Sequence, residues 1–270
     1  MTIITLDFET YYDKQFSLSK LTTEEYVNSD QFEVIGVGVK VGYAQPVWAT
    51  GNKIEIQQFL DGLDIPNSVL LCHNTFFDAT ILYERFGIVA KRYLDTLSMA
   101  RAIHDVSIGG SLAKLAVHYG LGEKGSEVVN ALGKRRVAFS NDELAAYGGY
   151  CINDVELTHK LFEKLFENFP VSELSLIDIT IKMAVCPTLT IDLPLLESYL
   201  YEVRSKKEAL LAVIGDKREE LMSNPKFAEL LKMHGVDPPM KISPTTGKLT
   251  YAFAKTDEAF QELLEHPSTE

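Results

Sequence analysis

The sequence lacks the features that membrane-spanning and secreted proteins need. No run approaches the roughly 20 consecutive apolar residues that cross a bilayer, and the N-terminus lacks the basic start and long apolar stretch of a signal peptide. Cysteine is scarce as well: Cys72, Cys151 and Cys186 are an odd number at wide spacings, with no metal-like pairing. We therefore predict a cytoplasmic protein with reduced, buried thiols and no membrane partner.

Positive charge is also in short supply, since 26 lysines and arginines stand against 38 aspartates and glutamates, a formal net charge of −12. This balance argues against a protein that coats nucleic acid through bulk electrostatics. It does not exclude nucleic acid as a substrate, because carboxylates that bind metal ions add to the negative count and the bound cations invert the local sign. Net charge alone therefore does not decide whether the protein acts on nucleic acid.

What the sequence does have is the composition of a globular protein, with 46% hydrophobic and 24% charged residues among its 270 positions. Strand-like runs come first and then alternate with helical patterns, which predicts an α/β domain over residues 1–170. Its clearest element is a helix that opens with the capping box Ser140–Glu143 and runs to Phe166. Residues 171–270 show helical patterns around a proline-rich loop at 235–248, so we predict an all-helical extension there.

Two carboxylates mark the first predicted strand. Asp7 and Glu9 are two residues apart, so both side chains project from the same strand face. Carboxylates placed this way repel each other unless a cation lies between them, and Mg²⁺ binds to a few carboxylates plus water. Taken alone, the pair also fits an ordinary solvated strand edge.

A second polar pair follows the apolar run Val69–Cys72. Asn74 and Asp78 lie where a predicted strand ends and the next helix starts, which is where open α/β sheets place their ligand sites. The simpler alternative is that Asn74 caps the helix and Asp78 is a stray exposed acid.

The third motif lies inside the capped helix. Tyr150 and Asp154 are four residues apart, which places the hydroxyl and the carboxylate on one helix face. Gly148 and Gly149, just before them, each cost about 1 kcal/mol relative to alanine in a helix interior, so we expect a close approach by another group to justify them. Tyr147 lies on nearly the same face and competes with Tyr150 for any role of a tyrosine hydroxyl.

Taken together, the motifs resemble those of the DEDD, or DnaQ-like, superfamily of 3′→5′ exonucleases over about residues 1–170. The first is Leu6–Thr10 (LDFET), the second His73–Asp78 (HNTFFD) and the third Tyr150–Asp154 (YCIND). The segment Asp95–Leu97 also resembles a recurrent, structural part of this superfamily. The resemblance implies an α/β, ribonuclease H-like fold with a mixed central sheet flanked by helices.

The resemblance also implies a catalytic set of Asp7, Glu9, Asp78, Asp154 and Tyr150. The four carboxylates would bind two divalent metal ions, Mg²⁺ or Mn²⁺, for hydrolysis of a phosphodiester to nucleoside 5′-monophosphates. Because tyrosine has a reference pKa near ~10 and is a poor base at neutral pH, we expect Tyr150 to orient the attacking water.

Tyr150 decides the subclass that the resemblance implies. The histidine variant carries His five residues before the last aspartate, where this chain has Gly149, and the tyrosine variant carries Tyr four residues before it. The tyrosine subclass includes proofreading domains of family A DNA polymerases and some RNA-trimming enzymes. Residues 239–255 resemble the segment that precedes the polymerase domain in some bacteriophage enzymes. We therefore expect a single-stranded DNA 3′ end as substrate, a polymerase domain in the same or another chain as partner, and the host cytoplasm as the location if a phage encodes the protein.

Residues beside the acidic motifs are expected to contact the substrate. Aromatic rings there would stack on a base, and the basic cluster Lys134–Arg136, in a predicted loop, would contact phosphates. The expected substrate-binding residues are Thr10, Tyr11, Tyr12, Asn74, Phe77, Lys134, Arg135 and Arg136. Core packing is the alternative for Phe76 or Phe77, and a solvated run of charge is the alternative for the basic cluster.

Two other functions fit the same motifs. An RNA 3′→5′ exonuclease would use the same chemistry, and the C-terminal resemblance disfavours it. The other alternative is a catalytically silent scaffold of exonuclease fold. The intact carboxylates and Tyr150 argue against it, because the loss of one carboxylate is the simplest route to silence.

We predict that Asp7→Ala abolishes hydrolysis and leaves the fold intact, because the substitution removes one of two repelling carboxylates. Digestion of a 5′-labelled DNA strand measures the first property, and circular dichroism measures the second. Full activity of the folded Asp7→Ala protein would refute the assignment of Asp7 to a metal site.

Overall fold

The protein is described by a computed structural model over residues 1–125, 131–214 and 221–265. The chain divides into two compact units, Met1–Leu189 and Thr190–Glu270. Among the helices in these described ranges, none combines the length and apolar character that a membrane span requires.

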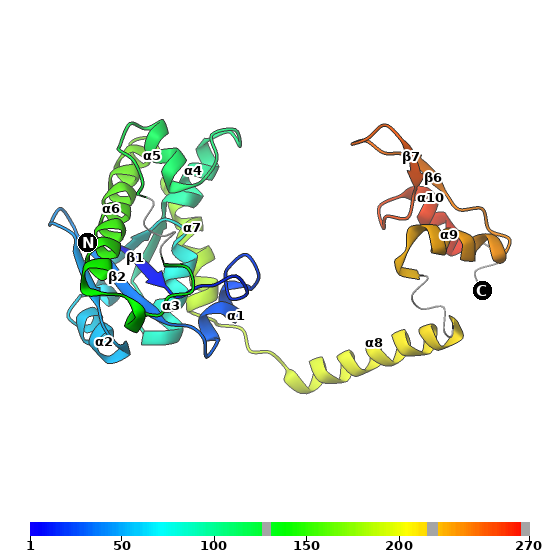
Figure 1. The fold of residues 1–270 in the computed structure, drawn as a ribbon, viewed down its shortest axis with the longest axis horizontal. Helices are drawn as coiled ribbons and strands as arrows, with labels where there is room; N and C mark the ends of the chain where they lie inside the picture. Colours follow the sequence, from blue (N-terminus) through cyan, green and yellow to red (C-terminus); the bar gives the residue numbers. More distant parts are fainter. Residues whose placement is uncertain (126–130, 215–220, 266–270) are drawn as a thin grey trace. The chain divides into compact units, whose positions relative to one another are not determined.

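A five-stranded sheet forms the centre of the first unit (Figure 1). Its strands are β1 (Ile3–Thr10), β2 (Val34–Val41), β3 (Val47–Thr50), β4 (Val69–Cys72) and β5 (Arg92–Asp95). Their order in the sheet is β3-β2-β1-β4-β5. The pairs β1–β2 and β2–β3 are antiparallel, whereas β1–β4 and β4–β5 are parallel. The predicted α/β fold with a mixed sheet is confirmed.

Helices cover both faces of this sheet, and each face has its own apolar core (Figure 1). One face carries α4 (Thr96–Ile103), α5 (Leu112–His118) and α6 (Asn141–Phe166). The other carries α1 (Thr23–Asn28), α2 (Lys53–Asp61), α3 (Thr75–Phe86) and α7 (Val171–Val185). Short 3-10 turns, Ile65–Asn67 and Arg136–Ala138, lie in the connections. Leu71 of β4 packs into the α6-side core, and its neighbour Leu70 packs into the α3-side core, as the alternation of a strand requires.

The same alternation along β1 separates core residues from polar ones. Ile4, Leu6 and Phe8 are buried in the α3-side core. Asp7 and Glu9 point to the opposite face, where side chains of α6 contact them. A register shift between Glu9 and Thr10 ends the regular pairing with β2, so the two carboxylates occupy the last regular positions of the strand.

The structure confirms the predicted capped helix as α6, a helix of 26 residues. Both bonds of the capping box are present: Glu143 N–H donates to Ser140 Oγ at 3.2 Å, and Ser140 N–H donates to Glu143 Oε2 at 2.9 Å. These bonds satisfy two of the unpaired backbone donors at the helix start. They fix where the helix begins and therefore which residues face the sheet.

Small residues let α6 lie close to the sheet. A β-carbon added at Gly148 would lie 2.5 Å from the indole of Trp48 on β3, and one added at Gly38 of β2 would lie 2.8 Å from Cys151 Sγ. A β-carbon at Gly149 would meet open space. Close approach therefore explains the first of the two helix glycines and not the second.

The first unit continues past residue 170, where we predicted the domain boundary. Ile181 and Val185 of α7 are buried in the α3-side core. Asp178 Oδ1 accepts a hydrogen bond from Tyr93 N–H of β5 at 2.9 Å. The compact unit ends at Leu189, because Pro170 leads into another helix of the same core rather than into a linker.

The second unit is mainly helical, as predicted, with one short hairpin. Its helices are α8 (Leu193–Ile214), α9 (Asn224–Met233) and α10 (Glu258–Gln261), followed by the 3-10 turn Glu262–Glu265. The hairpin strands are β6 (Met240–Ile242) and β7 (Leu249–Tyr251), so the segment predicted as a loop contains β6 and the turn. The rings of Tyr251 and Phe253 stack at 5.2 Å, and Phe227 packs edge-on against Phe253 at 4.9 Å. The last predicted helix extends to His266, which lies outside the described residues.

We predict opposite effects of the same substitution at two neighbouring glycines of α6. Gly148→Ala drives a methyl group into the indole of Trp48 and should lower the free energy of unfolding by about 1–3 kcal/mol. Gly149→Ala meets open space and should raise that free energy by up to about 1 kcal/mol through helix propensity. Urea unfolding of both variants measures the difference, and equal effects would contradict the close packing of α6 on Trp48.

Candidate active site

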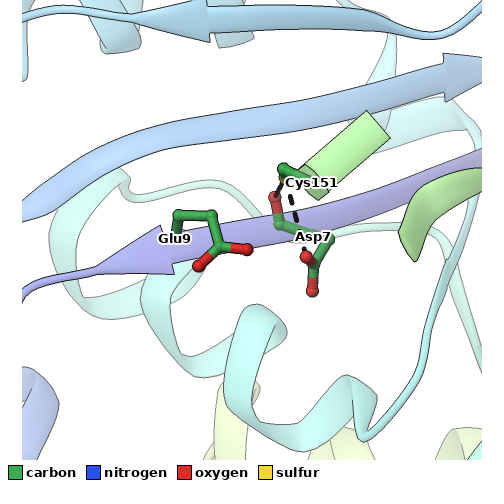
Figure 2. Close-up of side chains that lie close together, drawn as sticks. All are labelled: Asp7, Glu9 and Cys151. Carbon is green, nitrogen blue, oxygen red and sulfur yellow. Dashed lines mark hydrogen bonds between the residues drawn. The ribbon is translucent and has the colours of Figure 1, made fainter. Parts of the chain in front are cut away.

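The two carboxylates of β1 lie beside each other and beside a thiol. One oxygen of Asp7, one oxygen of Glu9 and Cys151 Sγ lie within 4.8 Å of one another. Figure 2 shows the Glu9 carboxylate turned toward Asp7, with Cys151 next to Asp7. Glu9 is buried and Asp7 is half-buried. Both project from the strand face that their spacing predicts.

Asp78 joins this group from the first turn of α3. It is buried, and its Oδ1 accepts a hydrogen bond from Phe8 N–H of β1 at 3.0 Å, so it is not a stray exposed acid. Asp95 at the end of β5 holds the start of α3, since its Oδ1 accepts from the N–H groups of Asn74 at 2.7 Å and Thr75 at 3.2 Å. The structural role predicted for Asp95 is confirmed.

Asp154 and Tyr150 reach the group from α6. Asp154 is 4% exposed, and its Oδ2 pairs with Lys124 Nζ at 2.5 Å. Its Oδ1 is buried and has no hydrogen-bond partner in the described part of the chain. The Tyr150 hydroxyl lies beside the Asp154 carboxylate, and burial followed by the Asp154 charge raises the pKa of this hydroxyl. The spacing of four residues therefore brings the two groups together as predicted.

Burial raises the pKa of every carboxyl group in this cluster, and neighbouring negative charge adds to the rise at Asp7, Glu9 and Asp78. Burial, and then the Asp154 charge, raise the pKa of Asp7 to about 7. Burial, followed by the Asp7 charge, raises the pKa of Glu9 and of Asp78 well above the usual range. Burial also raises the pKa of Asp154, and Lys124 opposes that rise. A cation bound among the four groups would therefore favour their ionised forms and lower their pKa values.

The donor set fits divalent metal ions. Four carboxylates from three elements, β1, α3 and α6, supply the oxygen ligands that Mg²⁺ and Mn²⁺ prefer. The buried Oδ1 of Asp154 lacks a partner, and buried polar atoms in native proteins are nearly always satisfied. A metal ion would satisfy it and reduce the repulsion at Asp7 at the same time.

Three residues near the carboxylates were not among the predicted site residues. Tyr147 donates a hydrogen bond to Glu9 Oε2 at 2.6 Å, so the two tyrosines do not compete: one binds Glu9 and the other lies beside Asp154. Cys151 lies three residues before Asp154, a spacing that already placed it on the same helix face. Lys124 lies in a loop outside any periodic element, and no pattern in the sequence signals its position.

A model of a protein family described as 3′-5′ exonuclease matches residues 22–169, more than half of the chain. The chain belongs to the 3′-5′ exonuclease family. The match covers Asp78, Tyr150 and Asp154, whereas Asp7 and Glu9 precede it. No curated protein matches the chain by sequence.

Several solved structures resemble this exonuclease in fold. RNase D from Trypanosoma brucei aligns with a TM-score of 0.50 and 16% identity, over 70% of this chain and 67% of that chain. NrnC from Brucella melitensis aligns with a TM-score of 0.49 and 13% identity, over 68% of this chain and 82% of that chain. The family B DNA polymerase from the archaeon Pyrobaculum calidifontis aligns with a TM-score of 0.45 and 16% identity, over 61% of this chain and 24% of that chain. The likeness to RNase D shows the fold alone, and it agrees with the predicted ribonuclease H-like architecture.

The residues after the first motif of the exonuclease bind largely to the protein itself. Thr10 is buried, and its hydroxyl lies 2.9 Å from the Tyr26 hydroxyl. The guanidinium of Arg135 lies over the Tyr11 ring at 4.0 Å. Tyr12 packs against a cluster of buried residues that includes Tyr147 and Tyr150 of α6. Substrate contacts by Thr10, Tyr11 and Tyr12 stay a prediction.

The second motif supplies one exposed candidate and one core residue. Asn74 is exposed, with a positive φ of 76°, and its side chain makes no capping hydrogen bond to α3. The capping alternative for Asn74 is therefore wrong. Phe77 is half-buried against the α3-side core, and its ring lies 6.0 Å from that of Tyr26. Core packing thus holds for Phe77, and a contact between either residue and substrate stays a prediction.

The basic cluster is partly neutralised by acidic neighbours. Lys134 Nζ pairs with Glu143 at 2.6 Å, and Arg135 Nη1 pairs with Glu33 at 3.0 Å. Arg136 lines a cavity of about 230 Å³. The cluster is therefore more than a solvated run of charge, and its contact with phosphates stays a prediction.

We predict that the metal-free exonuclease loses stability as the pH rises from about 4 to 7. The pKa of Asp7 is 3.8 in a free chain and about 7 in the folded one, so between these values the folded state holds a proton that the unfolded state has released. Each unit of such a difference corresponds to about 1.4 kcal/mol. Thermal unfolding in EDTA at several pH values measures the slope.

Two controls isolate the cause of this slope. Saturating Mg²⁺ should flatten it, because the bound ion favours the ionised carboxylates. Asp7→Asn should make it shallower without metal, since the amide has the same size and does not titrate, while burial still raises the pKa of Glu9 and Asp78. A metal-free protein whose stability rises with pH over this range would contradict the carboxylate cluster.

Proposed function

We propose that this chain is a 3′→5′ exodeoxyribonuclease that removes nucleotides one at a time from unpaired DNA 3′ ends and proofreads for a DNA polymerase. One observation carries the proposal: Asp7, Glu9, Asp78 and Asp154 converge from β1, α3 and α6, with Tyr150 beside the last of them. Membership of the 3′-5′ exonuclease family supports the reaction and its polarity.

Asp7 is the shared member of the proposed metal site. Its charge acts on both Glu9 and Asp78, and the Asp154 charge acts on it. Asp7, Glu9 and Asp154 would hold one Mg²⁺ or Mn²⁺, and Asp7 with Asp78 would hold the second. When bound, such ions acidify water and neutralise the charge that develops on a phosphate. Lys124, at 2.5 Å from Asp154, supplies positive charge at the same carboxylate.

The two tyrosines of α6 have separate tasks in this proposal. Burial raises the pKa of both hydroxyls, so each remains a hydrogen-bond donor. Tyr147 orients the Glu9 carboxylate. Tyr150, beside Asp154, would orient a water whose oxygen bonds to the phosphorus while the bond from phosphorus to the 3′-oxygen breaks. The products would be a nucleoside 5′-monophosphate and a strand that ends in a new 3′-hydroxyl.

The choice of DNA rests on two resemblances. The matching family model is named for the exonuclease of family A DNA polymerases, and residues 239–255 resemble the segment before the polymerase domain of some bacteriophage enzymes. A polymerase domain in the same or another chain would deliver the frayed end. RNA is the competing substrate, since an enzyme named RNase D shares the fold.

Digestion of 5′-labelled single-stranded DNA in Mg²⁺, Mn²⁺ or EDTA tests the proposal. We expect a ladder that shortens from the 3′ end by single nucleotides and is absent in EDTA. An RNA of the same sequence, run in parallel, decides between the substrates, and faster cleavage of RNA would replace DNA in the proposal. An uncut DNA strand in both metals would overturn it.

We predict that Tyr150→Phe and Tyr147→Phe, which remove the same atom from adjacent turns of α6, have different kinetic signatures. Tyr150→Phe should lower the rate at saturating Mg²⁺ by about 10- to 100-fold, because water is no longer oriented. Tyr147→Phe should weaken Mg²⁺ affinity by about 10-fold, because Glu9 loses the donor that orients it. Rates across a Mg²⁺ titration measure both, and full rescue of Tyr150→Phe by excess Mg²⁺ would refute its role.

A further inference from the structure

We propose that Cys151 completes, with Asp7 and Glu9, a binding site for thiophilic divalent ions, of which Zn²⁺ and Cd²⁺ are the examples. The site uses carboxylates assigned above, and it is independent of whether they hydrolyse anything. The proposal begins from the arrangement in Figure 2, where the thiol of α6 lies against the same stretch of β1 as the two carboxylates.

The distances suit three ligands of one ion. Cys151 Sγ lies 3.6 Å from Asp7 Oδ2, and it also donates to the Asp7 backbone oxygen at 3.3 Å. One ligand atom from each of Asp7, Glu9 and Cys151 lies within 4.8 Å of the others. The absence of a side chain at Gly38 leaves room for the sulfur, because a β-carbon there would lie 2.8 Å from it.

Asp154 supplies an independent indication of a ligand. Its Oδ1 is buried without a hydrogen-bond partner in the described ranges, and the whole residue is only 4% exposed. It lies one helical turn after Cys151, and its charge acts on Asp7, Glu9 and Cys151. A fourth ligand, the third oxygen, is therefore available for the tetrahedral shell that Zn²⁺ prefers.

Ligand chemistry separates these ions from Mg²⁺. A thiolate is a soft ligand that favours Zn²⁺ and its heavier relatives, whereas Mg²⁺ selects oxygen atoms and retains water. Binding would break the S–H bond, form a bond from sulfur to the metal and release the proton to solvent. A cavity of about 440 Å³, lined in part by Asp7, Asp154 and Lys124, gives an ion access from solvent. Because Asp7 and Glu9 would be shared, Zn²⁺ would exclude Mg²⁺ from them.

Cd²⁺ titration of the full chain without nucleic acid tests the proposal, with the thiolate-to-metal charge-transfer absorption in the ultraviolet as the readout. The wild-type protein should gain this absorption at one equivalent. Cys151→Ala should lack it, and Cys186→Ala, which removes a thiol that is not in the group of three ligands, should keep it. Loss of a residue that merely supports a metal ligand costs about 10- to 100-fold in affinity, so Cys151→Ala should weaken Zn²⁺ binding at least about tenfold.

Mg²⁺ binding to Cys151→Ala shows whether the carboxylates survive the substitution, and it should weaken by less than Zn²⁺ binding does, since the thiol gives Asp7 a weak hydrogen bond and gives Mg²⁺ no ligand. Should Cys151→Ala fail to fold, Cys151→Ser provides the same test with a nearly isosteric side chain. Absorption that persists without Cys151, or that is absent from the wild type, would overturn the proposal. A protein that gives the absorption and cleaves no nucleic acid would refute the proposed function and leave this site standing.

Discussion

The structure around the site depends on one constraint, which is that four like charges share a buried space. Repulsion between carboxylates grows as water is excluded, and removing charges from water is costly in itself. The protein offsets part of this energy with a bond from the Phe8 N–H to Asp78, a bond from Tyr147 to Glu9, and the Lys124 ion pair with Asp154. Within the described residues, the side chain of Asp7 accepts a hydrogen bond only from the weak donor Cys151. The uncompensated remainder is the physical basis on which we propose that this group of residues binds cations.

The rest of the fold holds β1, α3 and α6, the three elements that carry the carboxylates, at closely fixed distances. Asp95 fixes the start of α3 and thereby the height of Asp78 above the sheet. Gly38 and Gly148 set how near α6 comes to β2 and β3. A larger side chain at either glycine would move α6 away from Asp7. Residues outside the proposed metal site thus decide whether its carboxylates meet.

Sequence reasoning found the parts of the site that local periodicity governs. Asp7 and Glu9 share a face because a strand alternates, and Asp154 and Tyr150 share one because four residues make a helical turn. The capping box at Ser140 fixed the frame of the helix as well. The features that sequence reasoning missed depend on tertiary contacts. Lys124 pairs with Asp154, 30 residues further along the chain. Helix α7 joins the first core despite following Pro170, and the β6–β7 hairpin depends on pairing that no single segment encodes.

Trp48 is the single tryptophan of the chain, and it lies at the contact that sets the spacing of α6. Its indole abuts the backbone at Gly148, and its ring lies 6.3 Å from that of Tyr147, whose hydroxyl holds Glu9. The fluorescence of this protein's one tryptophan therefore comes from a ring that packs near Tyr147, and Tyr147 in turn bonds to the Glu9 carboxylate. Any event that shifts α6 against the sheet changes the surroundings of this one fluorophore, so the fold contains an intrinsic optical probe of its proposed active site.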